Sequence, residues 1–153
     1  MAQPVDIDLT REMTSSADSL WAVLSDLRRL PEWLAFAASL EDVSSDAAVE
    51  GATYTVKPGR AFEPKTKWKI VTVEERRRQV HASEMPMLSG VTSTIELQAP
   101  AAGGPASVHV HWHGEPSNVF GRMMRGMFQR QIEANWRKSL EELDRVAGAA
   151  QGS

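Results

Sequence analysis

The sequence predicts an α+β domain in which a seven-stranded antiparallel sheet is wrapped around one long C-terminal helix. Three observations predict this class: an alternating segment near the N-terminus, six strand-like runs in succession, and a single amphipathic stretch at the end. Short turns join the runs, which favours antiparallel pairing because a parallel connection needs a crossover of about a dozen residues. The expected element order is β-α-α-β6-α.

The chain begins with a predicted strand followed by two short helices. Apolar and polar residues alternate over residues 5–9, which is the period of a half-buried strand. Ser15 or Ser16 then provides an N-cap for a helix through the apolar segment LWAVL. Pro31 fits best in the first turn of a second helix, so we expect a break between the two helices near Arg29.

Six strand-like runs follow, separated by glycine, proline or charged turns. They cover residues 40–43, 52–57, 65–74, 79–84, 91–98 and 107–115. Alternation predicts that the face toward the core carries Tyr54, Val56, Trp68, Ile70, Val80, Ala82, Val91, Ser93, Ile95, Val108, Val110 and Trp112. The opposite, solvated face is expected to carry Lys65, Lys67, Lys69, His81, Thr92, Thr94, Glu96, His109, His111 and His113.

The last helix is predicted to begin between Ser117 and Arg122 and to end near Val146. Its second half carries an apolar stripe at helical spacing: Phe128, Ile132, Trp136, Leu140 and Leu143. Its first turns are rich in methionine and are interrupted by two glycines, which weakens the helix and suits an adaptable ligand mouth. Methionines that only fill gaps in the core explain the same pattern, so both interpretations stay open.

Length and composition agree with one compact domain and exclude several function classes. A chain of 153 residues buries roughly 70% of its unfolded surface, so we expect one domain over residues 1–147 and a flexible tail over residues 148–153. The absence of cysteine excludes disulfides, thiol nucleophiles and cysteine-ligated metals. A net charge of -3 argues against a nucleic-acid partner. The acidic N-terminus and the lack of a long apolar run predict a cytoplasmic protein without membrane insertion.

The chain resembles a known superfamily over about residues 5–146. The stretches that carry the resemblance are SADSLWAVLSDLRRLPEW at 16–33, GATYTV at 51–56, WKIVTVE at 68–74 and GEPSNVFGRMM at 114–124. They are similar to the SRPBCC or START-like (Bet v 1-like) superfamily, in its polyketide cyclase/dehydrase-type branch. The resemblance implies a helix-grip fold with a deep cavity for lipids, sterols or polyketides. It does not choose between carriers and enzymes, because the fold serves both.

The predicted cavity wall combines inward strand residues with aromatic and methionine side chains from the helices. The candidates are Trp33, Phe36, Tyr54, Val56, Trp68, Ile70, Val80, Val91, Ser93, Ile95, Val110, Trp112, Met123, Met124, Met127 and Phe128. No residue is assigned a catalytic role, because the sequence lacks a Ser-His-Asp order, a phosphate-binding glycine loop and an HExxH helix.

Three functions stay open at this stage. The first is binding, sequestration or transport of a hydrophobic small molecule without metal or organic cofactor, for which we expect a nearly apolar cavity. The alternative is a cofactor-independent polyketide aromatase/cyclase, which requires acid and base side chains deep in the cavity. A third is a regulator that docks an unspecified protein partner and has a small cavity and an exposed apolar patch.

The segment 109–113 places three histidines on one face of one strand. Neighbouring histidines at this spacing lie roughly 6.5–7 Å apart, close enough for two of them to share a metal ion. A metal site would need a further ligand from Glu96, Glu115 or an adjacent strand. A solvated sheet face is the simpler interpretation, and no metal is expected.

Overall fold

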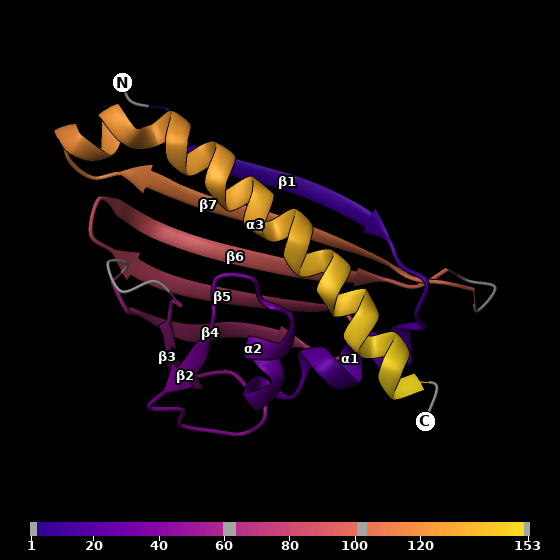
Figure 1. Cartoon of the computed structure of the whole chain (residues 1–153). Helices are drawn as coiled ribbons and strands as arrows, with labels where there is room; N and C mark the ends of the chain where they lie inside the picture. The colour runs from indigo at the N-terminus through magenta and orange to yellow at the C-terminus, as the bar shows by residue number, and fades with distance from the viewer. Residues whose placement is uncertain (1–2, 60–63, 101–103, 152–153) are drawn as a thin grey trace.

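The computed structural model describes residues 3–59, 64–100 and 104–151. Its elements are β1 (Val5–Glu12), α1 (Ala17–Leu24), the 3-10 helix η1 (Leu27–Arg29), α2 (Leu30–Trp33), β2 (Ser39–Glu41), β3 (Thr53–Lys57), β4 (Thr66–Glu74), β5 (Arg78–Met85), β6 (Leu88–Gln98), β7 (Ser107–Pro116) and α3 (Val119–Gln151). This order confirms the predicted β-α-α-β6-α arrangement (Figure 1). None of the helices in these residue ranges has the length and apolarity needed to cross a bilayer.

Within the described residues, seven strands form one sheet in the order β1-β7-β6-β5-β4-β3-β2. Every neighbouring pair is antiparallel, which confirms the predicted sheet. β1 pairs with β7, and the strands from β2 to β7 lie side by side in chain order. β1 and β2 are therefore the two edge strands. The bounds differ most at β2, which spans Ser39–Glu41, and at β6, which begins at Leu88 instead of residue 91.

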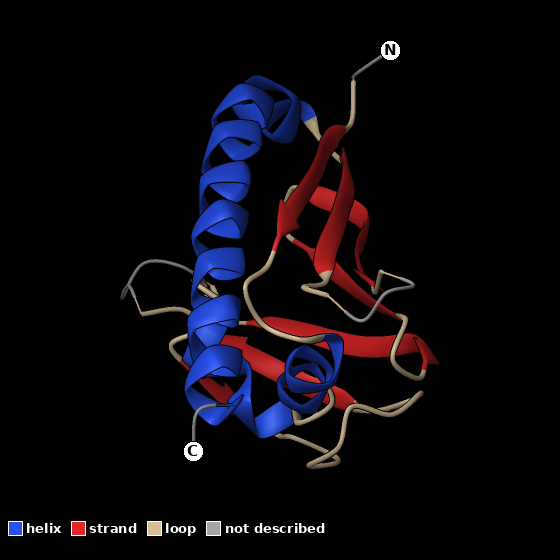
Figure 2. Cartoon of the chain, turned by 90° about the vertical axis from the view of Figure 1, so that its right-hand side faces the viewer, coloured by secondary structure: helices blue, strands red, loops and turns tan. Residues whose placement is uncertain are grey.

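The helix α3 lies across one face of the curved sheet (Figures 1 and 2). It begins at Val119, inside the predicted window, but it continues to Gln151 instead of ending near Val146. Ala147 is fully buried, and alanine is the strongest helix former, so the helix extends into the predicted tail. The predicted helix end near Val146 is therefore wrong, since residues 148–151 of the expected tail belong to α3, and residues 152–153 lie outside the described part.

The two N-terminal helices pack against the C-terminal half of α3 (Figure 1). Ser16 is the N-cap of α1, and its hydroxyl accepts a hydrogen bond from the Ser19 backbone N–H at 3.2 Å. The predicted break is present as η1, after which Pro31 occupies the first turn of α2. The Ser139 hydroxyl accepts a 2.8 Å hydrogen bond from the Ala35 backbone N–H and so ties the end of α2 to α3.

The faces of β7 agree with the prediction. Val108, Val110 and Trp112 are buried on the inner face of the sheet, which α3 covers. The side chains of His109, His111 and His113 are 24%, 41% and 33% exposed on the outer face. They are less exposed than a solvated face implies, because carboxylates of β1 lie against them.

The predicted faces of β5 are wrong. The buried residues of this strand are Gln79, His81 and Ser83. Val80, a predicted cavity residue, and Ala82 alternate with them and point to the outer face. Directly opposed residues of an antiparallel pair share a face, and His81 stands opposite Ile70 of β4 and Ser93 of β6. Pairing with buried neighbours therefore overrides the apolar character of Val80.

The carboxylate of Asp144 ties α3 to the junction between β1 and α1. It is 7% exposed and accepts hydrogen bonds from the Thr14 N–H at 2.9 Å, the Thr14 hydroxyl at 3.0 Å and the Ser15 N–H at 3.1 Å. Burial acts to raise the pKa of Asp144, but these hydrogen bonds outweigh it and hold the pKa below its usual range. The ionised carboxylate therefore stabilises the folded state.

We expect Asp144→Asn to lower the free energy of unfolding by about 2 kcal/mol, because a neutral amide accepts weaker hydrogen bonds and has only one acceptor atom. Urea denaturation followed by circular dichroism measures the loss. The matched control is Glu141→Gln on the exposed side of the same helix, with an expected change below about 0.5 kcal/mol. Equal losses in the two variants would contradict the role given to Asp144.

Candidate functional site

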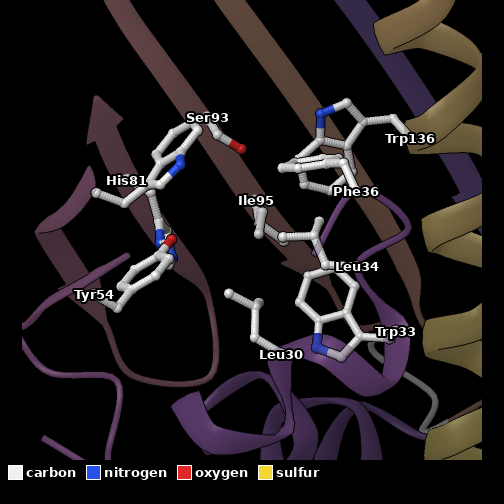
Figure 3. Close-up of a pocket in the computed structure, with 10 residues that line it drawn as sticks. Leu30, Trp33, Leu34, Phe36, Tyr54, His81, Ser93, Ile95 and Trp136 are labelled. Carbon is white, nitrogen blue, oxygen red and sulfur yellow. Dashed lines mark hydrogen bonds between the residues drawn. The ribbon is translucent and has the colours of Figure 1, made fainter. Parts of the chain in front are cut away.

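A small cavity lies between the inner face of the sheet, α2 and α3 (Figure 3). Its volume is about 20 Å³, enough for one water molecule and far below the roughly 300–1,000 Å³ of typical ligand pockets. Between the sheet, α2 and α3, the deep cavity that the resemblance implies is thus nearly filled, whereas a larger hollow of about 1160 Å³ opens along β3 to β6, beside Lys67, Lys69 and Thr92. The walls of the small cavity are formed by Leu30, Trp33, Leu34, Phe36, Tyr54, Trp68, His81, Ser93, Ile95 and Trp136.

A chain of hydrogen bonds forms the polar end of the cavity. The Tyr54 hydroxyl lies 2.7 Å from Nδ1 of His81, and Nε2 of His81 lies 2.9 Å from Oε1 of Gln79. The Gln79 amide nitrogen donates to the backbone carbonyl of Leu24 at 2.8 Å. Because that carbonyl can only accept, Gln79 presents its oxygen to the imidazole, so Nε2 of His81 donates and Nδ1 accepts from Tyr54. The Leu24 carbonyl therefore sets the tautomer of His81.

Burial keeps both ionisable groups of this chain uncharged near neutral pH. Desolvation lowers the pKa of His81 from 6.5 to about 4, because the charged imidazolium is disfavoured in the core. Desolvation also raises the pKa of the Tyr54 hydroxyl far above its usual range. The Tyr54 hydroxyl is thus a neutral donor, and Nδ1 of His81 is the neutral acceptor of its hydrogen bond.

The opposite wall contains two tryptophan indoles whose N–H groups have no partner within the described residues. Trp33 and Trp136 pack at a ring-centroid distance of 6.3 Å, and Phe36 meets Trp136 edge-on at 5.9 Å. Among the described residues, Nε1 of Trp33 and Nε1 of Trp136 are buried without a hydrogen-bond partner. A buried donor without an acceptor costs roughly 1–3 kcal/mol. An oxygen atom brought into this region would remove that cost.

The structure brings six of the predicted site residues to the cavity: Trp33, Phe36, Tyr54, Trp68, Ser93 and Ile95. Five others are buried in the core without lining it: Val56, Ile70, Val91, Val110 and Trp112. Sequence reasoning missed Leu30, Leu34, His81 and Trp136 as lining residues. The alternation of Gln79, His81 and Ser83 separates the two faces of β5, but it does not tell which face is buried.

The predicted methionine mouth is not assembled. Met123 and Met127 are 74% and 41% exposed, and Met124 and Phe128 are half-buried without reaching the cavity. Val119 and Phe120 extend this exposed apolar surface to the start of α3. A small cavity together with an exposed apolar patch agrees with the docking alternative as well as with a closed ligand pocket.

An antiparallel sheet curved around one long helix, with an aromatic pocket between them, defines a helix-grip domain. The chain belongs to the polyketide cyclase/dehydrase and lipid transport family, whose sequence model matches residues 4–148. No curated protein matches the sequence.

Solved structures share the fold at low sequence identity. StfQ, a di-domain aromatase/cyclase of the steffimycin biosynthetic pathway, aligns with a TM-score of 0.76 and 15% identity over 98% of this chain and 52% of StfQ. The chain therefore spans about half the length of StfQ. Norcoclaurine synthase of Thalictrum flavum aligns with a TM-score of 0.75 and 17% identity over 99% of this chain and 98% of the synthase. At these identities the likeness shows the fold alone.

The buried imidazole predicts a pH-dependent stability. The unfolded chain binds a proton near the ordinary pKa of 6.5, whereas folded His81 binds it only near pH 4, so the unfolded state holds more protons between these values. The free energy of unfolding should therefore fall by about 3 kcal/mol as the pH decreases from about 6.5 to about 4. Chemical denaturation at a series of pH values measures this loss.

The variant His81→Gln should lose this component of the pH dependence, because it removes the titrating group. The control His109→Gln changes a histidine on the outer face and should keep that component. If wild type and His81→Gln lose the same stability over this range, the assignment to His81 is wrong.

Proposed function

We propose that the chain binds an apolar small molecule that carries an oxygen atom, in the space between the sheet, α2 and α3. The observation that supports this function is the division of the cavity wall into an aromatic side and a polar end. Aromatic and aliphatic walls with a few convergent polar groups are typical of small-molecule sites. The membership of a family that includes cyclases and lipid-transport proteins agrees with this function.

A ligand larger than water requires the cavity to open. Three lining residues, Leu30, Trp33 and Leu34, come from α2 and the residue after it. Phe36 lies in the turn that follows, and the other lining residues belong to β-strands and to α3, which spans 33 residues, whereas α2 spans 4. A short helix is the wall that moves most easily, because few hydrogen bonds hold it. Opening would break the bond between Ala35 and Ser139 and separate Trp33 from Trp136.

The free indole N–H groups favour a ligand with a carbonyl. Each of these groups is buried without an acceptor in the part of the chain that the structure describes, and a carbonyl oxygen can accept from one of them. The apolar remainder of such a ligand would replace the contacts that separate when α2 moves. Lipid, sterol-like and polyketide ligands all satisfy this description, and the polyketides carry the most carbonyl groups.

Isothermal titration calorimetry with 1-tetralone and with tetralin, the same bicyclic ring system without the carbonyl, tests the proposal. We expect 1-tetralone to bind at least about fivefold more tightly, since one satisfied buried donor is worth roughly 1–3 kcal/mol. Ser93→Val adds one heavy atom beside a cavity the size of one water and should weaken the binding of both compounds.

Thr92→Val is the matched control for Ser93→Val, because Thr92 is the neighbouring residue on the outer face of β6. It should leave both affinities unchanged. Unchanged binding in a folded Ser93→Val variant would place the ligand elsewhere. Absence of binding to the wild type would overturn the proposal and favour the docking alternative.

A second candidate function is acid–base catalysis of aldol closure and dehydration, and the Tyr54–His81 pair favours it. The Tyr54 oxygen can take a proton from a carbon beside a carbonyl while its own proton passes to Nδ1 of His81. The resulting enolate attacks a second carbonyl, a C–C bond forms, and the proton returns through Tyr54 to the alkoxide. Removal of a second proton from the same α-carbon then expels the hydroxyl group from the newly bonded carbon. The hydroxyl group takes up a proton and leaves as water.

The low pKa of His81 limits this reaction. Protonation of a histidine with a pKa of about 4 costs about 4 kcal/mol at pH 7. An enolate formed next to the imidazolium reduces the cost, because opposite charges attract strongly in a buried site. Simple binding needs no such compensation, and for this reason it stands first.

Exchange of the α-protons of 1-tetralone with D2O, followed by NMR, tests the catalytic function. The wild type should accelerate the exchange above the rate in buffer, and Tyr54→Phe should reduce that acceleration at least about 100-fold, since it removes the group that transfers the proton. Thr92→Val should exchange like the wild type. If the wild type binds 1-tetralone without accelerating the exchange, the protein is a binding protein for this class of ligand.

A further inference from the structure

Three potential metal ligands converge on the outer face of the sheet, away from the interior cavity. They are Asp6 on β1 and His111 and His113 on β7, and one ligand atom from each lies within 4.8 Å of the others. Oδ1 of Asp6 lies 2.5 Å from Nε2 of His111 and 3.5 Å from Nδ1 of His113. We propose that these residues bind a divalent transition-metal ion of the Zn²⁺ type.

The register of β1 and β7 produces this arrangement. Asp6 stands directly opposite His113, and His111 is two residues away on the same face of β7. The imidazole centroids of His111 and His113 are 6.3 Å apart. Tetrahedral zinc with bonds of about 2.0–2.1 Å holds its ligand atoms about 3.3 Å apart, so side-chain rotations would have to widen the 2.5 Å Asp6–His111 contact and shorten the longer separations. Among the further ligands that the sequence left open, Glu96, Glu115 or a residue of an adjacent strand, it is Asp6 on the adjacent β1 that joins the two histidines.

The backbone beneath the site is held from two sides. Gln129 of α3 accepts a hydrogen bond from the Asp6 backbone N–H at 3.1 Å and donates one to the Asp6 carbonyl at 2.8 Å. The two histidines lie on β7, which is hydrogen-bonded to strands on both of its edges. The ligands are thus carried by ordered backbone, which limits the reorganisation that an ion would require.

The chemistry of the donor set selects the ion. Two neutral imidazoles and one carboxylate suit zinc, nickel and copper, whereas magnesium and calcium prefer oxygen ligands alone. The side chains of Asp6, His111 and His113 are 51%, 41% and 33% exposed, so an ion from solvent can reach them. Water would complete the coordination, as it does in zinc sites with three protein ligands. Such an ion would pin the edge strand β1 to β7.

Isothermal titration calorimetry of the untagged chain with ZnCl2 in metal-free buffer tests the proposal. We expect one Zn²⁺ per chain. His111→Ala or His113→Ala should weaken binding at least about tenfold, because loss of a direct ligand costs no less than loss of a supporting residue. The melting temperature of the wild type should rise with the Zn²⁺ concentration, and that of His111→Ala should not.

The matched control is His109→Ala, which removes a third histidine from the same face. His109 is paired with Asp8 at 2.6 Å and is not part of the cluster, so its removal should leave the affinity unchanged. Asp6→Asn keeps the size of the side chain, weakens the third ligand and should lower the affinity. Absence of Zn²⁺ binding to the wild type, equal binding by His111→Ala, or an equal loss in His109→Ala would overturn the proposed ligand set.

Discussion

The register of the antiparallel sheet is the constraint on which the interior depends. Opposed residues must share a face, so Ile70, His81, Ser93 and Trp112 form one row across four strands beneath α3. Because His81 belongs to this row, its imidazole lies in the core although it is polar. The core then has to satisfy that imidazole, and it does so with Tyr54 on one nitrogen and the Gln79 amide on the other.

The order of helices and strands follows from the periodicity of the sequence, whereas the choice of the inward-facing side of β5 does not. Hairpin spacing and alternation suffice for the order of the strands, and an apolar stripe suffices for the covering helix. In β5, however, either Val80 or His81 can face inward, and hydrophobicity favours Val80. The decision rests on partners outside the strand: the buried Ile70 and Ser93 stand opposite His81, and the Leu24 carbonyl accepts the hydrogen bond of the Gln79 amide. No pattern within the strand contains that information.

The candidate site was predictable in part: Ser93 and Ile95 were found beside four aromatic residues, but His81 and Trp136 were not. Large rings at inward positions, such as Trp33 and Trp68, reach the cavity as alternation and helical spacing indicate. The methionines of α3 do not: Met123 and Met127 are exposed, and the half-buried Met124 lies about 18 Å along the helix from Trp136, which lines the cavity. Composition indicates that a helix start is adaptable, but it does not tell which turn of the helix lies at the cavity.

The two hydrogen bonds between Gln129 and the backbone of Asp6 have a consequence for self-association. A side-chain amide that donates to a carbonyl and accepts from the N–H of one residue imitates the pairing of a neighbouring strand. β1 is an edge strand, and unpaired edges are templates on which strands of other molecules add. Gln129 occupies the polar groups that such an addition would use at Asp6. α3 thereby also hinders the addition of a further strand at this edge.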